Sequence, residues 1–197
     1  MYIKKTPEET ARTEIETLIT DTMGKDYVSL SVRRFSLKED YSKNIVTSTV
    51  ELKMSNARPL LKINGSGVGI VDSVFMGYFN HFRTKYCSLD KISLESFNVR
   101  VEPTEVEKTR SAVSIVVEFG NSYGKIIPFR ASTPCLTRSA VTCLNAAYEY
   151  YINCELSFRK LKYLTEESQS RGRFDIKESY TSKLVKLVGV SSYEEVC

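Results

Sequence analysis

The chain has 197 residues, of which 42% are hydrophobic and 26% are charged, and its net charge is +4 at pH 7. These proportions are ordinary for a globular protein, and the length suits one domain with extensions. The basic and acidic residues are interspersed and no apolar run could span a bilayer, so neither a nucleic-acid partner nor a membrane is expected.

The first 26 residues are expected to form a helical N-terminal extension. Thr6 is a typical N-cap residue, Pro7 suits the first helical position, and Glu9 completes a capping box. Gly24 is predicted to end this helix.

Three strands and a helix are predicted to follow. Alternating apolar residues indicate strands over residues 28–37, 46–54 and 60–64, and the alternation slips before Phe35, which is typical of a β-bulge. Three glycines then precede a helix, predicted because apolar residues recur at helical spacing: Val71, Val74, Phe75, Tyr78, Phe79, Phe82 and Tyr86.

The same order of elements then repeats. Strands are predicted over residues 92–101, 113–119 and 125–129, and the first again shows a slip of phase, before Phe97. A polar loop separates the first two strands, at residues 103–110. Thr133 as N-cap and Pro134 at the first position predict a second helix.

Two copies of one unit explain this order. Residues 46–80 align with residues 111–145 without a gap, although few positions are identical. The sequence therefore predicts an α+β fold in which residues 27–155 form two β-β-β-α units related by a pseudo-twofold axis.

Residues 156–197 are expected to form a helical C-terminal extension. The second helix is predicted to continue to about residue 164, and polar residues 166–173 are predicted to be a linker. Asp175 then caps a last helix that ends at Gly189, followed by a short tail at residues 191–197.

The glycine turn at Gly65, Gly67 and Gly69 has two interpretations. A turn that opens onto a helix can offer backbone N–H groups to a small anion. Such turns are more often tight connections without a ligand, and the residues alone favour that second interpretation. Asp72 in the first helical turn suits the helix dipole.

Little else in the sequence indicates catalysis. His81 is the single histidine and is expected on the surface, and no residues have metal-ligand spacing, so neither a metal nor a cofactor is expected. The five cysteines have no paired spacing, which favours free thiols and a cytoplasmic location.

Two motifs in this chain resemble signatures of a known family. Residues 67–73 (GVGIVDS) are similar to GDGPVDA, and residues 132–140 (STPCLTRSA), followed by Leu144-Asn145-Ala146, are similar to STDIIEASA followed by LNA. Residues 27–151 thus resemble the C-terminal regulatory domain of 2-isopropylmalate synthase and of the related citramalate and homocitrate synthases.

This resemblance implies a homodimeric sensor that binds leucine or isoleucine between its units, near the helix N-termini. The residues implied to contact the ligand are Gly67, Gly69, Val71, Asp72, Ser132 and Thr133. Phe129, Pro134 and Lys91 depart from the family's pattern, which leaves open a homodimeric scaffold or interaction protein whose ligand site has degenerated.

The resemblance also implies that this chain alone is not an enzyme. In the family a metal- and acetyl-CoA-dependent TIM barrel precedes the module, and only 26 residues precede it here. A separate catalytic synthase subunit is then a candidate partner. An RNA-binding α/β module is a third interpretation, disfavoured because no Lys/Arg cluster marks the helix starts.

Overall fold

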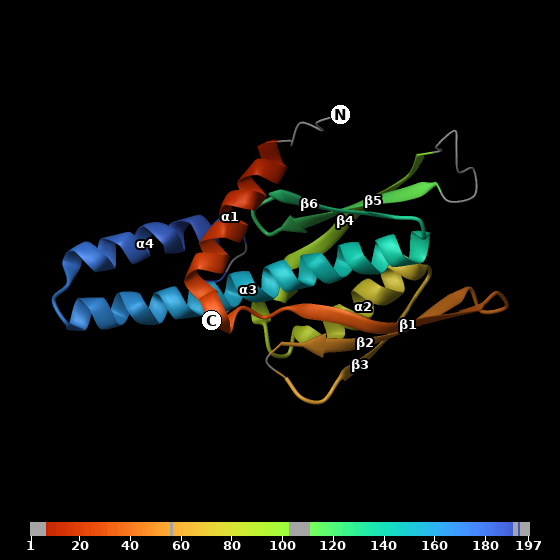
Figure 1. Ribbon diagram of the computed structural model, residues 1–197, viewed down its shortest axis with the longest axis horizontal. Helices are drawn as coiled ribbons and strands as arrows, with labels where there is room; N and C mark the ends of the chain where they lie inside the picture. The colour runs from red at the N-terminus through yellow and green to blue at the C-terminus, as the bar shows by residue number, and fades with distance from the viewer. Residues whose placement is uncertain (1–6, 56, 103–110, 191–192, 194–197) are drawn as a thin grey trace.

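The computed structural model describes residues 7–55, 57–102, 111–190 and 193, and it shows an α+β fold (Figure 1). Predicted features at Thr6, in the loop 103–110 and in most of the tail lie outside these residues. In chain order the described elements are α1 (Pro7–Met23), η1 (Gly24–Asp26), β1 (Leu30–Asp40), β2 (Ile45–Met54), β3 (Leu61–Gly67), α2 (Ile70–Phe82), η2 (Cys87–Lys91), β4 (Ile92–Glu102), β5 (Ala112–Asn121), β6 (Ile126–Thr133), α3 (Leu136–Ser170) and α4 (Phe174–Val188).

The strands form two antiparallel sheets, with orders β1-β2-β3 and β4-β5-β6. Each sheet is followed by its helix, so the predicted pair of β-β-β-α units is confirmed. The register of β1 shifts between Val32 and Arg34, and that of β4 shifts between Leu94 and Ser96. Both slips of the apolar alternation are therefore real irregularities, at corresponding places in the two units.

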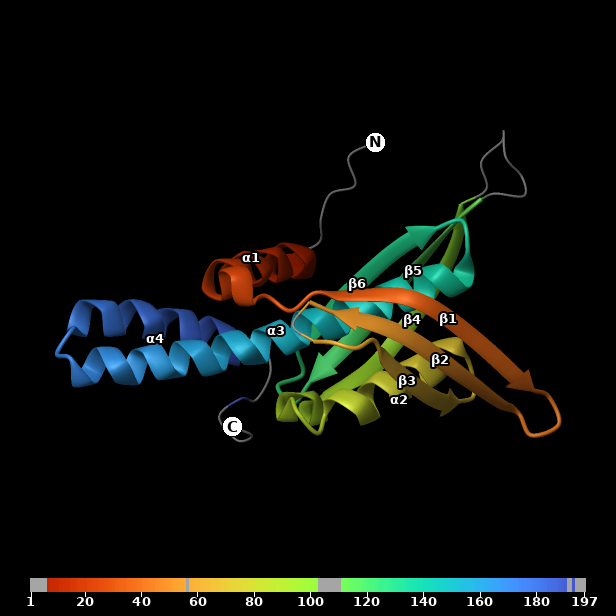
Figure 2. The same cartoon turned by 60° about the horizontal axis from the view of Figure 1, so that its bottom comes forward.

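Helices α2 and α3 lie between the two sheets (Figures 1 and 2). α2 packs on β2 and β3, α3 packs on β5 and β6, and the helices contact each other. The ring of Phe75 on α2 lies 6.0 Å from that of Phe119 on β5, and Tyr78 lies 5.1 Å from Tyr148 on α3. These aromatic side chains join both units into one core, since they pack across the boundary between them.

The ends of both central helices differ from the prediction. α2 ends at Phe82 rather than at Tyr86, although Tyr86 is still buried because the following turn folds back. α3 begins after Cys135, since Thr133 is paired with Val113 as the last residue of β6. Pro134 is therefore in the connection, and Thr133 is not an N-cap.

The polar stretch at residues 166–173 is mostly helical, so the prediction of a linker there was wrong. α3 continues to Ser170 and passes residue 155 without a break. Gly172, with φ of 67°, allows the tight turn that leads into α4. α3 and α4 then pack as a hairpin that projects away from the sheets (Figures 1 and 2).

Hydrogen bonds tie the N-terminal segment to the core. Arg12 on α1 donates to the carbonyl oxygen of Pro128, at 2.5 Å. Beyond Gly24, which has φ of 51°, the buried side chain of Asn153 on α3 bonds both the N–H and the C=O of Val28, each at 2.8 Å. These contacts fix the direction in which β1 begins.

Candidate functional site

The glycine turn between β3 and α2 is occupied by a side chain of the same chain. The Asp72 carboxylate accepts a hydrogen bond from the backbone N–H of Val68, at 2.9 Å. A ligand carboxylate at this turn would therefore compete with the negative charge of Asp72. Asp72 lies in the first turn of α2, as expected, but its carboxylate bonds a backbone N–H of the preceding glycine turn.

The glycines here also let a strand and a helix approach closely. A Cβ added at Gly65 would overlap the carbonyl oxygen of Ser73 and would lie 2.9 Å from the amide nitrogen of Gly77. A Cβ added at Gly67 would overlap the Asp72 carboxylate, whereas one at Gly69 would meet nothing within 4 Å. Gly65 is thus required for packing, and Gly69 leaves open space beside the helix start.

The connection between β6 and α3 is organised around Ser139, which the motif contains but sequence reasoning did not single out. Its hydroxyl accepts from the N–H of Thr133 at 2.9 Å and donates to the carbonyl oxygen of Val113 at 2.7 Å. Thr133 itself bonds the N–H of Cys135, while Ser132 is exposed. The polar groups of this turn therefore mostly bond one another.

In both views the starts of α2 and α3 lie at the same end of the molecule (Figures 1 and 2). The six predicted ligand residues belong to these two starts and to the strands that precede them. None of the six lines the groove described next, which lies beside the start of α3.

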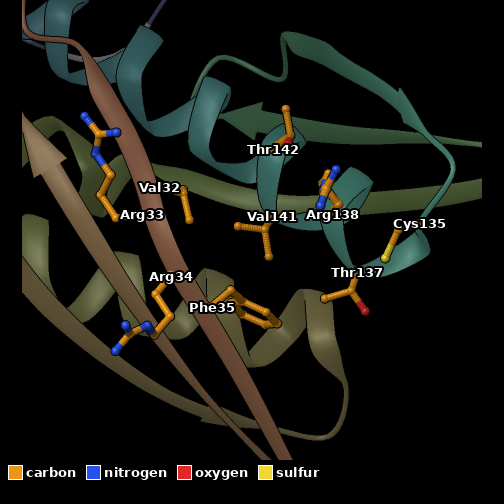
Figure 3. A pocket seen from close by; sticks show the side chains of 9 residues that line it. All are labelled: Val32, Arg33, Arg34, Phe35, Cys135, Thr137, Arg138, Val141 and Thr142. Atoms are coloured by element: carbon orange, nitrogen blue, oxygen red, sulfur yellow. The ribbon is translucent and has the colours of Figure 1, made fainter.

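This groove has a volume of about 560 Å³ and separates β1 from the first turns of α3, so each unit supplies one wall. We call it the β1–α3 groove. Val32 and Phe35 from β1 and Val141 from α3 occupy the space between strand and helix (Figure 3). Thr137 and Thr142 add hydroxyl groups on the helix side. The groove thus combines an apolar floor with polar groups, as small-molecule sites commonly do.

Three arginines are among the residues at the groove: Arg33, Arg34 and Arg138. Arg138 comes from the α3 side, while Arg33 and Arg34 extend from β1 away from the helix (Figure 3). Arg34 lies 3.6 Å from the Glu51 carboxylate. Arg33 and Arg138 have no hydrogen-bonded or ion-paired side chain among the described residues. The positive charge of Arg138 therefore favours an anionic ligand in the groove.

The β-bulge in β1 explains why Arg33 and Arg34 lie together at the groove. The extra residue in β1 is at Arg33, so consecutive arginines lie where the strand bends next to α3. The slip of apolar alternation before Phe35 was visible in the sequence. Nothing in the sequence indicated that α3 would lie beside this bulge and form the other side of the groove.

Other predicted chemistry can be located in the described residues. His81 is exposed, as expected, and partial burial lowers its pKa. Cys87, Cys135, Cys143 and Cys154 are free thiols. Within the described ranges, no cluster of three or more His, Cys, Asp or Glu residues could hold a metal ion.

Comparison with known proteins adds no assignment. The chain matches no protein-family model and no curated protein sequence. The resemblance to the regulatory domain of 2-isopropylmalate synthase thus rests on the two motifs and on the order of the elements. Among the helices of the described ranges, none has the length and apolar character needed to cross a bilayer.

Proposed function

We propose that this chain is a non-catalytic regulatory module that binds a small branched-chain amino acid, leucine or isoleucine, in the β1–α3 groove. The observation that carries the proposal is the groove between the two units, with an apolar floor and a guanidinium that has no described partner. Its volume of about 560 Å³ falls in the range of small-molecule sites, about 300–1,000 Å³.

Two of the ligand's groups, its side chain and its α-carboxylate, have complementary partners in the groove. Val32, Phe35 and Val141 offer an apolar surface to a branched side chain. Arg138 offers a cation to the α-carboxylate, close to the positive N-terminal end of α3. The groove therefore replaces the glycine turn as the proposed site, because Asp72 already fills that turn.

Thermal denaturation with added amino acids tests this proposal. A ligand that binds only the folded state at 100 times its Kd adds about 2.7 kcal/mol of stability. For a domain of this size, the expected rise in Tm is about 5–11 °C. Leucine or isoleucine should give this rise, and lysine should not, because the apolar floor has no partner for the ammonium group at the end of its side chain.

Three variants locate the binding. Arg138→Gln should abolish most of the rise in Tm, whereas Arg173→Gln, at an exposed arginine before α4, should keep it. Gly69→Ala should also keep it, because this glycine is not in the groove. If no branched-chain amino acid raises the Tm at millimolar concentration, the sensor proposal is refuted and the degenerate scaffold remains.

The other proposed properties follow the family resemblance. We propose that the chain forms a homodimer, acts in the cytoplasm and associates with a separate catalytic synthase subunit. The chain alone should not condense acetyl-CoA with a 2-oxo acid when a divalent metal is added, and sustained turnover would contradict the non-catalytic role. A salt-sensitive complex with RNA in a gel-shift assay would favour the RNA-binding alternative instead.

A further inference from the structure

Strand β4 carries an uncovered row of apolar side chains. Phe97, Val99 and Val101 are exposed at 53%, 43% and 60% of their surfaces. They lie directly opposite Val117, Ile115 and Val113 on β5, and residues directly opposite in a ladder share a face of the sheet. Because Val117 and Ile115 are fully buried, the exposed row continues the face that packs on the core.

The matching strand of the first unit is protected in a different way. At the corresponding positions β1 has Phe35, which packs partly against the core, Leu37 and the charged Glu39. β1 also contacts α3 and carries further charged residues at its bulge and near its end. Charged residues and covering helices are common ways to keep a strand edge from pairing with another chain.

β4 has less of this protection, although it too carries a charged residue at its bulge, Glu95, and at its end, Glu102. Between Phe97 and Val101 the only charged residue is Arg100. In the described part of the chain, β4 pairs with β5 on one side and has no strand on the other. An eleven-residue strand with a free edge and an apolar face is the kind of surface to which a second strand adds.

We infer that β4 pairs antiparallel with β4 of a second copy of this chain, about a twofold axis at Val99. In this register Val99 faces Val99 of the second copy, and Phe97 faces Val101. The three exposed apolar residues of each copy then form one continuous patch on the two β4 strands, at the centre of a six-stranded sheet. On the opposite face, Asn98 lies opposite Arg100, so no like charges meet.

Neighbouring registers are less favourable. An axis at Arg100 would place two guanidinium groups directly opposite each other, which is repulsive. An axis at Asn98 would place Val101 of one copy against Glu95 at the bulge of the other, where the ladder is irregular. A register centred between two residues would place the apolar row of one copy on the same side of the sheet as the polar face of the other. The axis at Val99 is therefore the register that the sequence of β4 supports.

This inference specifies the surface for the self-association that is part of the proposed function. Amino-acid binding does not enter into it, since none of the β4 residues lines the β1–α3 groove. Dimerisation through β4 can therefore be tested independently of ligand binding.

Light scattering coupled to size exclusion tests the interface on the full chain. The wild type should be a dimer at micromolar concentration, and Val99→Lys should weaken self-association at least tenfold. Val185→Lys is the matched control, because Val185 is exposed at 68% on α4, and it should leave the dimer intact. Circular dichroism should show the same fold for all three proteins, since both sites face solvent.

Oxidative cross-linking gives a second measurement. Val99→Cys should form a disulfide-linked dimer, whereas Leu37→Cys, on the corresponding strand β1 and exposed at 41%, should give only the background of the wild type. A monomeric wild type, a Val99→Lys protein that remains dimeric, or preferential cross-linking through Leu37→Cys would each overturn the inference. A wild-type dimer whose Tm does not change with leucine or isoleucine would refute ligand binding without contradicting this interface.

Discussion

Replacing Gly65 with alanine should destabilise the protein more than the same change at Gly67 or Gly69. The added methyl group at Gly65 meets the backbone of α2, at Ser73 and Gly77, and backbone atoms cannot rotate away as a side chain can. Either β3 or the whole helix must therefore move outward, which loosens the packing of α2 on its sheet.

The expected magnitudes follow from what each methyl group meets. Overpacking a close contact costs about 1–3 kcal/mol, and Gly65→Ala should lie at the upper end of this range. Gly67→Ala displaces the Asp72 carboxylate, breaks its hydrogen bond to Val68 and places the methyl group 2.8 Å from the backbone nitrogen of Ser73, so its cost should lie lower in the same range. Gly69→Ala meets nothing within 4 Å; alanine is a poorer N-cap than glycine but also restricts the unfolded chain, and because these two effects oppose each other the net change should be only about a few tenths of a kcal/mol.

Urea denaturation and thermal melts measure this series. For a chain of 197 residues, about 3 kcal/mol corresponds to a fall in Tm of about 6–12 °C. Gly69→Ala serves as the control and should melt within about 1 °C of the wild type. If Gly65→Ala were as stable as Gly69→Ala, β3 and α2 would not be in direct backbone contact, and the packing described here would be wrong.

Three further predictions concern the core. Asn153→Ala leaves the buried N–H and C=O of Val28 without their partner, so the free energy of unfolding should fall by about 2–4 kcal/mol, whereas exposed Asn80→Ala should change it little. Burial raises the pKa of the core tyrosines, so in the unfolded chain they ionise at lower pH than in the folded one. Because the unfolded chain then binds fewer protons, stability should fall as pH rises above about 10, and the absorbance of these tyrosinates should appear only with unfolding. Burial raises the pKa of Cys143 to about 11, so at pH 8 a thiol reagent should modify exposed Cys135 first and Cys143 only in denaturant; equal rates would contradict the buried position.

Local patterns in the sequence predicted the elements and their order because the information lies within each element. The alternation in β1 and β4 shows directly where each strand slips, and both bulges were predicted. Tyr86 fits the helical spacing of α2 but lies beyond its end, since a turn that folds back can bury an aromatic ring just as a helix does. Periodicity reports burial and not the backbone conformation that achieves it.

The missed features depend on contacts between distant segments. Residues 166–170 look like a linker by composition, yet they are helical because α4 returns along the end of α3. The Gly65–Gly77 contact and the β1–α3 groove likewise need a folded chain, because Arg33 and Arg138 lie roughly 100 positions apart. The glycine turn was recognised as a feature, but the position of the Asp72 carboxylate could not be read from its spacing alone.

Because α3 is a single unbroken helix, it connects the groove rigidly to the far end of the molecule. The helix starts beside Arg138 at the groove, crosses the core and ends in the projecting hairpin with α4 (Figure 1). Its 35 residues span about 52 Å at a rise of about 1.5 Å per residue. Tilting such a rod by about 5° about its first turn displaces its last turn by about 4–5 Å, at the same rise. A small change in the direction of the helix at the groove is therefore a much larger displacement at the tip of the hairpin.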